Sequence, residues 1–114
     1  MCDLYGIPNC DTMKKARRWL DSNGVAYSFH DYKKEGIDAE LLATWAETVG
    51  WEVLLNRRGM TWRKLPDEDK LDLDQARAIE LMTANPSMIK RPVLITEALI
   101  EVGFSEQRYS EIFQ

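Results

Sequence analysis

The hydrophobic pattern of the chain begins with a strand, a loop and a helix. The apolar run Leu4–Ile7 is too short for a helix and is interrupted by Pro8 and Asn9, so we expect a strand there. From residue 11 to residue 23, apolar residues recur at helical spacing, and the pattern stops at an Asn-Gly pair. Cys10 therefore lies at the junction between a predicted strand and a predicted helix.

The next segment has the alternating pattern of a second strand. Val25, Tyr27 and Phe29 alternate with smaller or polar residues up to Asp31, which places the large side chains on one face. A right-handed crossover through the helix would make this strand parallel to the first. His30 in this segment has no evident partner in the sequence, and we assign it no catalytic role.

The middle of the chain is predicted to be helical. Asp38 is placed to cap a helix that ends near Gly50, and its apolar residues are spaced three and four apart: Leu41, Leu42, Trp45, Ala46 and Val49. Asp72 with Gln75 fits a capping box for a second helix, which an Asn-Pro pair at 85–86 would end. The region 51–69 between them indicates short helices or loops.

The last quarter returns to strands. Val93–Thr96 and Leu99–Val102 predict a hairpin, and Ser105 is placed to cap a final helix, with Phe104 and Tyr109 positioned as a hydrophobic staple. The order strand-helix-strand, helices, strand-strand-helix predicts an α/β fold. Its small mixed four-stranded sheet would combine a parallel pair from the crossover with an antiparallel pair from the hairpin.

Composition and charge narrow the class of protein. A length of 114 residues suits one domain, and 45% hydrophobic residues are enough for a packed core. Fifteen basic against nineteen acidic residues give a net charge of −4, which argues against a nucleic-acid partner. The sequence contains neither a membrane-spanning apolar run nor a targeting peptide. With two cysteines, we expect a reducing compartment, the cytoplasm, and no disulfide scaffold.

Cys10 is the main candidate for chemistry. At the start of a helix, unpaired N–H groups and the helix dipole favour a thiolate. An unperturbed thiol with a pKa near 8.5 is about 3% ionised at pH 7, and a drop of about two units, worth about 2.7 kcal/mol, would ionise roughly three quarters. A helix end supplies only about 0.3 to 1 kcal/mol, so a cation must help. The candidates are Lys14 and Arg91.

Cys2 is expected to have a different role. It begins the strand that Cys10 follows, which separates the two by on the order of 20 Å and excludes an internal disulfide. We expect Cys2 to be structural or incidental. One histidine and two distant cysteines also make a metal site improbable, and we expect the four tryptophans to be packing residues.

Three blocks of residues together resemble a known family. Residues 6–16 read GIPNCDTMKKA, residues 55–59 read LNRRG, and residues 89–94 read IKRPVL. In this order they are similar to the arsenate reductase and Spx family (ArsC-like), and most closely to its YffB branch. The resemblance implies a single thioredoxin-like domain over 1–114, with an α-helical insertion at about 33–90.

The resemblance also implies roles for particular residues. It makes Cys10 the reactive thiol and Arg91 the residue that binds a substrate anion, with Pro92 following a cis peptide bond. Asn9 and Thr12 are expected to line the pocket. Arsenate reductases of the glutathione-dependent kind surround the cysteine with three arginines, whereas this chain has Asn56 and Gly103 near the places of the other two.

A second departure concerns the thiol that would resolve a mixed disulfide. Spx-type regulators usually carry Cys-x-x-Cys, and here the fourth position is Met13. The leading hypothesis is therefore a glutathione-dependent thiol reductase with Cys10 as its single catalytic cysteine. Arg58 or Arg57 would assist Arg91, or these arginines would only form a solvated basic face.

We expect no bound cofactor and no metal, with glutathione as co-substrate. The partners would be glutathione and an oxidised thiol or small anionic substrate, acting on a monomer. Two alternatives are arsenate (oxyanion) reduction at the same site and a Spx-like regulator that binds RNA polymerase.

Overall fold

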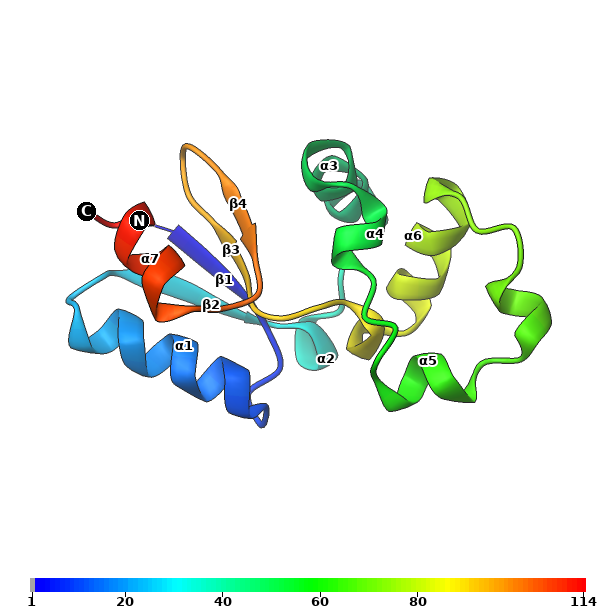
Figure 1. The fold of residues 1–114 in the computed structure, drawn as a ribbon, viewed down its shortest axis with the longest axis horizontal. Coiled ribbons are helices and arrows are strands. Elements are labelled where there is room, and N and C mark those ends of the chain that lie inside the picture. The colour runs from blue at the N-terminus through cyan, green and yellow to red at the C-terminus, as the bar shows by residue number, and fades with distance from the viewer. Residues whose placement is uncertain (1) are drawn as a thin grey trace. The chain divides into compact units, whose positions relative to one another are not determined.

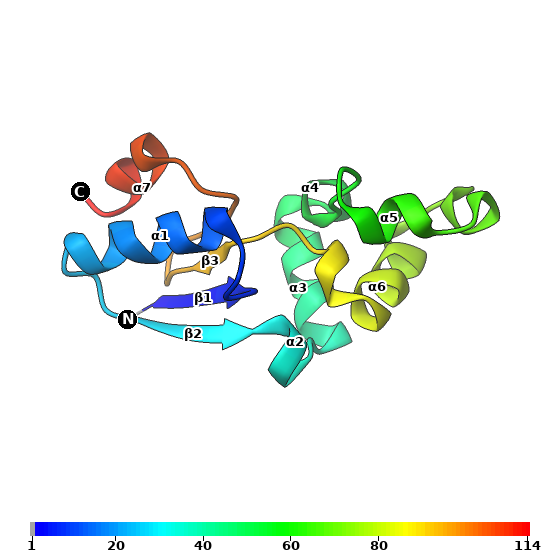
Figure 2. The same cartoon turned by 90° about the horizontal axis from the view of Figure 1, so that it is seen from below.

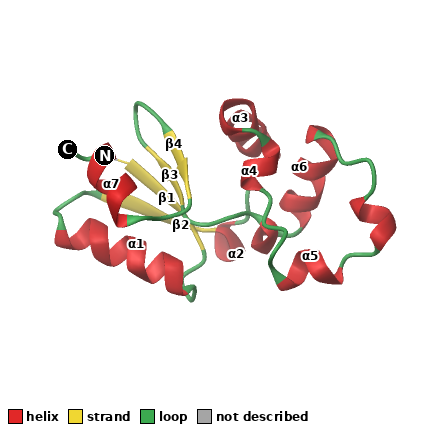
Figure 3. Ribbon diagram, viewed as in Figure 1, coloured by secondary structure: helices red, strands yellow, loops and turns green. Residues whose placement is uncertain are grey.

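The computed structural model describes residues 2–114, and the chain divides into two compact units (Figure 1). The first unit contains the residues up to Asp31 together with Arg91–Gln114, and the second contains Tyr32–Lys90. The four strands all belong to the first unit, and the elements of the second are helices (Figure 3). Among the described residues, no helix has the length and apolar character needed to cross a membrane.

The strands of the first unit form one mixed sheet. β1 (Cys2–Gly6), β2 (Tyr27–Asp31), β3 (Val93–Ile95) and β4 (Ile100–Val102) lie in the order β2-β1-β3-β4. β1 is parallel to β2 and antiparallel to β3, and β3 forms a hairpin with β4. The predicted α/β fold with a mixed four-stranded, thioredoxin-like sheet is confirmed.

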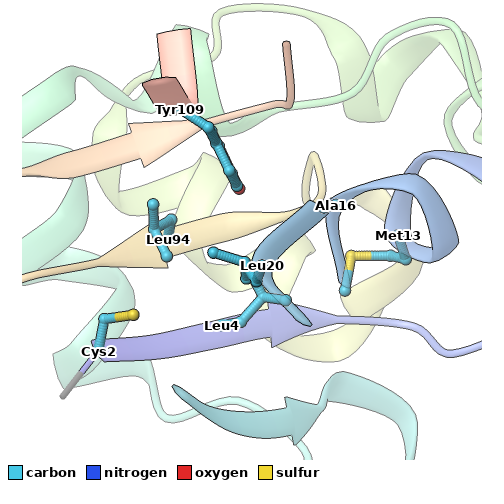
Figure 4. Close-up of a cluster of buried hydrophobic side chains, with 7 residues drawn as sticks. All are labelled: Cys2, Leu4, Met13, Ala16, Leu20, Leu94 and Tyr109. Carbon is cyan, nitrogen blue, oxygen red and sulfur yellow. The ribbon is translucent and has the colours of Figure 1, made fainter. Parts of the chain in front are cut away.

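Two helices cover one face of this sheet. α1 (Asp11–Ser22) and α7 (Glu106–Ile112) lie on the same side of the strands (Figure 2). The apolar face predicted for α1 is fully buried, and it packs with side chains from β1, β3 and α7 (Figure 4). The buried cluster contains Cys2, Leu4, Met13, Ala16, Leu20, Leu94 and Tyr109.

The start of α7 is fixed as its sequence predicts. Ser105 Oγ accepts a hydrogen bond from the Arg108 backbone N–H, which satisfies a donor that has no partner within the helix. The Phe104 ring meets the Tyr109 ring edge to face, with centroids 4.7 Å apart. This contact is the predicted hydrophobic staple, and it anchors the loop after β4 to the core.

His30 has partners that the sequence does not reveal. Its ring stacks on Tyr5 with centroids 4.4 Å apart, and its Nε2 lies 2.9 Å from Asp3 Oδ1. The interpretation of His30 as a residue without a partner was wrong. The parallel register places Tyr5 directly opposite His30, and this pairing depends on tertiary structure.

The second unit consists of short helices packed on two longer ones. α3 (Ala39–Val49) packs against α6 (Gln75–Ala84) and is capped by Asp38, whose carboxylate accepts a hydrogen bond from the Glu40 N–H. The other elements are α2 (Tyr32–Glu35), α4 (Trp51–Leu54), α5 (Met60–Lys64) and the 3₁₀ helices η1 (Asp67–Lys70) and η2 (Pro86–Met88). Region 51–69 thus contains short helices, as expected.

The predicted cap of α6 was wrong by two residues. Asp74 precedes the helix, and its Oδ1 accepts a hydrogen bond from the Arg77 N–H at 2.9 Å. Asp72 instead has a φ of 51° in the turn before it, a left-handed conformation in which aspartate is tolerated. Asp72 and Asp74 both have a carboxylate that can cap a helix, so the residue type alone does not show which of them caps α6.

Gly6 allows α1 to pack closely on β1. A Cβ placed at this glycine would lie 2.7 Å from Met13 Cε and closer still to Met13 Sδ. Met13 is fully buried. The absence of a side chain at position 6 therefore makes room for a large residue at position 13.

We predict that Gly6→Ala destabilises the protein by about 1–3 kcal/mol, because the added methyl group overpacks the contact with Met13. The free energy of unfolding from urea titration measures the effect. In a Met13→Ala background, the same Gly6→Ala change should cost clearly less, because the opposing side chain is gone. An unchanged free energy of unfolding in the single variant would contradict this account.

Candidate active site around Cys10

Cys10 is the residue that caps the start of α1. Its backbone is extended, with φ −110° and ψ 132°, and its carbonyl oxygen accepts the first helical hydrogen bond from the Lys14 N–H at 3.0 Å. The thiol is half-buried at the end of the loop that follows β1. The strand-loop-helix pattern of the sequence therefore delivers Cys10 to a helix N-terminus, as predicted.

The sheet brings Arg91 to the same place. Tyr5 near the end of β1 pairs with Val93 at the start of antiparallel β3, so the residues preceding Val93 extend toward those following Tyr5. The Arg91–Pro92 peptide bond is cis, as the resemblance implied. The Pro92 carbonyl oxygen accepts a hydrogen bond from the Gly103 N–H at 2.8 Å, which ties this turn to the end of β4.

Arg91 and the helix start act together on the Cys10 thiol. Burial raises the pKa of Cys10, but this effect is outweighed by the Met13 N–H, a hydrogen bond from the Arg91 side chain, the Thr12 N–H and the positive charge of Arg91. The net result is a pKa below that of an ordinary thiol, so more thiolate is present at neutral pH. Of the two cations considered, Arg91 acts on Cys10, whereas Lys14 is exposed one turn into α1.

Cys2 lies at the opposite end of β1 in a different environment. Its side chain is 4% exposed and belongs to the core cluster, and burial raises the pKa of the Cys2 thiol. Its Sγ donates to the Ala26 carbonyl oxygen at 3.5 Å. Both cysteines are free. Cys2 is therefore a core residue, and the pKa values of the two thiols are shifted in opposite directions.

The other residues expected to line the pocket lie in different parts of the structure. Thr12 contributes its backbone N–H to the thiolate site, and Asn9 is exposed in the turn between β1 and Cys10. Arg57 and Arg58 belong to the second unit, in the turn between α4 and α5.

The surroundings of Arg57 and Arg58 distinguish the two. The Arg57 guanidinium lies 5.8 Å from the Trp51 ring centroid and 5.9 Å from that of Trp62, a cation–π arrangement. The backbone N–H of Arg58 donates to Asn56 Oδ1, which stabilises the turn. Two of the tryptophans therefore hold a cation in addition to packing.

Gly103 has a backbone conformation that favours glycine over a residue with a side chain at this position. Its φ is 87°, in the left-handed region that side chains other than glycine rarely adopt. Its N–H is also engaged with Pro92. Among the described residues, no cluster of three His, Cys, Asp or Glu side chains is placed to hold a metal ion.

These features define a class of protein: a thioredoxin-like domain that presents a cysteine with a lowered pKa beside a cis-proline turn. The family model ArsC matches residues 5–112. The chain belongs to the ArsC family.

Relatives with known sequences span nearly the whole chain. An uncharacterized protein of Haemophilus influenzae is 42% identical over 114 residues, covering 99% of both chains. The global transcriptional regulator Spx of Enterococcus faecalis is 33% identical over 109 residues, covering 93% of this chain and 81% of its own.

Solved structures also match nearly the whole chain. A YffB protein is 57% identical, with a TM-score of 0.94 over 97% of both chains. An arsenate reductase (ArsC) related protein from Brucella melitensis is 55% identical, with a TM-score of 0.78 over 99% of this chain and 94% of its own. The predicted family and its YffB-like character are confirmed.

We predict that Arg91→Ala raises the pKa of the Cys10 thiol, because the thiolate loses a hydrogen bond and a neighbouring positive charge. The rate of alkylation by iodoacetamide as a function of pH reports this pKa. Its inflection should move to higher pH, and the rate at pH 7 should fall several-fold. Lys14→Ala is the matched control and should leave the inflection in place. Equal profiles for Arg91→Ala and the parent would refute the role of Arg91.

Proposed function

We propose that this protein is a glutathione-dependent thiol reductase that works through Cys10 alone. The observation that carries the proposal is the inequality of its thiols: Cys10 is half-buried with a lowered pKa, whereas Cys2 is buried with a raised one. Position 13, where a second cysteine would stand in a Cys-x-x-Cys motif, is occupied by buried Met13. A single usable thiol suits chemistry in which the second thiol comes from solution.

The reaction proceeds by two thiol–disulfide exchanges. In the first, the Cys10 thiolate attacks one sulfur of a substrate disulfide, a Cys10 mixed disulfide forms, and the other sulfur leaves as a thiolate. When the substrate is a glutathionylated thiol, attack on the glutathione sulfur leaves glutathione on Cys10. In the second, a glutathione thiolate attacks this mixed disulfide, releasing oxidised glutathione and regenerating the Cys10 thiolate. The net reaction thus converts one glutathionylated thiol and one glutathione into the free thiol and oxidised glutathione.

Arg91 has two roles in this scheme. Its guanidinium stabilises the Cys10 thiolate before attack. In the second exchange the Cys10 thiolate is the leaving group, so the same guanidinium lowers the barrier to its release. Its positive charge also suits a glutathione carboxylate. The backbone beside the cis Arg91–Pro92 bond would hydrogen-bond the peptide part of glutathione in an extended conformation. Asn9 and Thr12 would line the site.

Arsenate reduction is the second candidate function, because a thiolate beside a guanidinium is also a site for an oxyanion. Solved relatives whose names include arsenate reductase support it at the level of the family. Against it stand Asn56 and Gly103 near the positions where further arginines are expected. Arg57, whose guanidinium lies over two indole rings, and Arg58 belong to the second unit.

We expect oxidised glutathione to form one adduct on the parent protein, seen by intact mass spectrometry. Cys10→Ser should abolish the adduct, and Cys2→Ser, the matched control, should retain it. Cys10→Ser should also abolish turnover of 2-hydroxyethyl disulfide with glutathione, whereas Cys2→Ser should retain it, because only the Cys10 thiol is reactive.

Other results would replace the proposal. Labelling at Cys2 with an unreactive Cys10 would refute the assignment of the nucleophile. Glutathione-coupled turnover of arsenate that needs Cys10, without turnover of the disulfide, would make arsenate reduction the function. Absence of both activities together with co-purification of RNA polymerase would favour a Spx-like regulator.

A further inference from the structure

A groove of the first unit lies between α1 and the segment that enters α7. It has a volume of about 650 Å³ and is half open to solvent. One wall is a single face of α1, with Thr12, Lys15, Arg18 and Trp19. The other wall contains Phe104 and Glu106, and two serines complete the lining.

Each wall of the groove contains a residue close in the chain to the Cys10 site. Thr12 lines the groove, and its backbone N–H acts on the Cys10 thiol. Phe104 directly follows Gly103, whose N–H donates to the Pro92 carbonyl oxygen. One end of the groove is thus formed by residues that neighbour the reactive site along the chain.

The length of the groove exceeds what a tripeptide needs. Its lining on α1 runs from Thr12 to Ser22, which at 1.5 Å per residue corresponds to about 15 Å along the helix axis. An extended peptide rises about 3.3 Å per residue, so the groove accommodates roughly four to five residues. Glutathione, a tripeptide held at Cys10, would leave most of it unfilled.

The chemistry of the lining indicates what would fill it. Trp19 and Phe104 are partly buried against the core and offer an apolar floor. Lys15 and Arg18 are exposed and form no ion pair with any residue from 2 to 114. The lining therefore carries two cations, Lys15 and Arg18, against one carboxylate, Glu106.

We propose that this groove binds an acidic and apolar polypeptide segment that flanks the oxidised cysteine of a protein substrate. The inference rests on the proposed function, which it extends from disulfides in general to glutathionylated proteins. The cysteine sulfur of such a substrate leaves when the Cys10 thiolate attacks the glutathione sulfur, and glutathione then restores the Cys10 thiolate as described above. The flanking segment lies along α1 and raises the local concentration of the disulfide at Cys10.

The test uses synthetic peptides with a central S-glutathionyl cysteine, flanked on both sides by alternating glutamate and leucine. A second peptide carries lysine in place of each glutamate. We expect the parent protein to have a several-fold higher kcat/KM for the glutamate peptide.

The charge-reversed variant Lys15→Glu/Arg18→Glu should lower kcat/KM for the glutamate peptide about tenfold and favour the lysine peptide instead. Turnover of 2-hydroxyethyl disulfide should not change, since this small substrate does not reach the groove. Lys64→Glu, an exposed charge reversal in the second unit, is the matched control and should retain the preference of the parent.

Binding separates failure of this inference from failure of the proposed function. The glutamate peptide with serine in place of its cysteine should bind the Cys10→Ser protein, and the charge-reversed variant should lose this binding in a fluorescence anisotropy titration. Turnover of the small disulfide without any preference between the peptides, or a preference that survives charge reversal, would overturn the groove proposal alone. Loss of all turnover together with charge-dependent binding would overturn the reductase and leave the groove as a peptide site.

Discussion

The candidate site depends on the position of β1 at the centre of the sheet. β1 is hydrogen-bonded on one side to parallel β2 and on the other to antiparallel β3. The parallel neighbour requires the crossover through α1, which places a helix N-terminus directly after the strand. The antiparallel neighbour brings the start of β3 beside the end of β1. Cys10 and Arg91, far apart in the sequence, therefore meet at one edge of the sheet.

This geometry accounts for the difference between the two cysteines. Both are attached to β1, one at its buried beginning and one beyond its end. Burial raises the pKa of both thiols, and only Cys10 has the N–H groups and the guanidinium that outweigh it. The contact between Gly6 and Met13 adds a further constraint, because position 13 is filled by a large apolar side chain that belongs to the core. A cysteine at position 13, placed to resolve a mixed disulfide, would lose this packing.

Membership of the ArsC family narrows the chemistry without selecting one reaction. Relatives that share most of the chain include transcriptional regulators named Spx and proteins named for arsenate reductase. A common framework can carry different functions. In this chain position 13 is a buried methionine, and Gly103 has the left-handed backbone that favours glycine.

Local signals in the sequence determine most of the elements. The periodicity of α1, the caps Asp38 and Ser105, and the hairpin of β3 and β4 depend on neighbours within a few residues, and each was predicted correctly. The cap of α6 was predicted wrongly because the same local signal occurs at two positions. Asp72 and Asp74 offer the same side chain, and the choice depends on which backbone conformation the packed helix requires.

The sequence by itself therefore determined the α/β order, the position of Cys10 at a helix start and the inertness expected of Cys2. Only the tertiary structure decided that Arg91 rather than Lys14 acts on the thiolate, that His30 pairs with Asp3 and Tyr5, and that a groove forms between α1 and the start of α7. The physical reason is the range of the interactions. Helix caps and periodicity act within one or two turns of chain, whereas a thiolate responds to charges close in space, which strand pairing brings from the other end of the sequence.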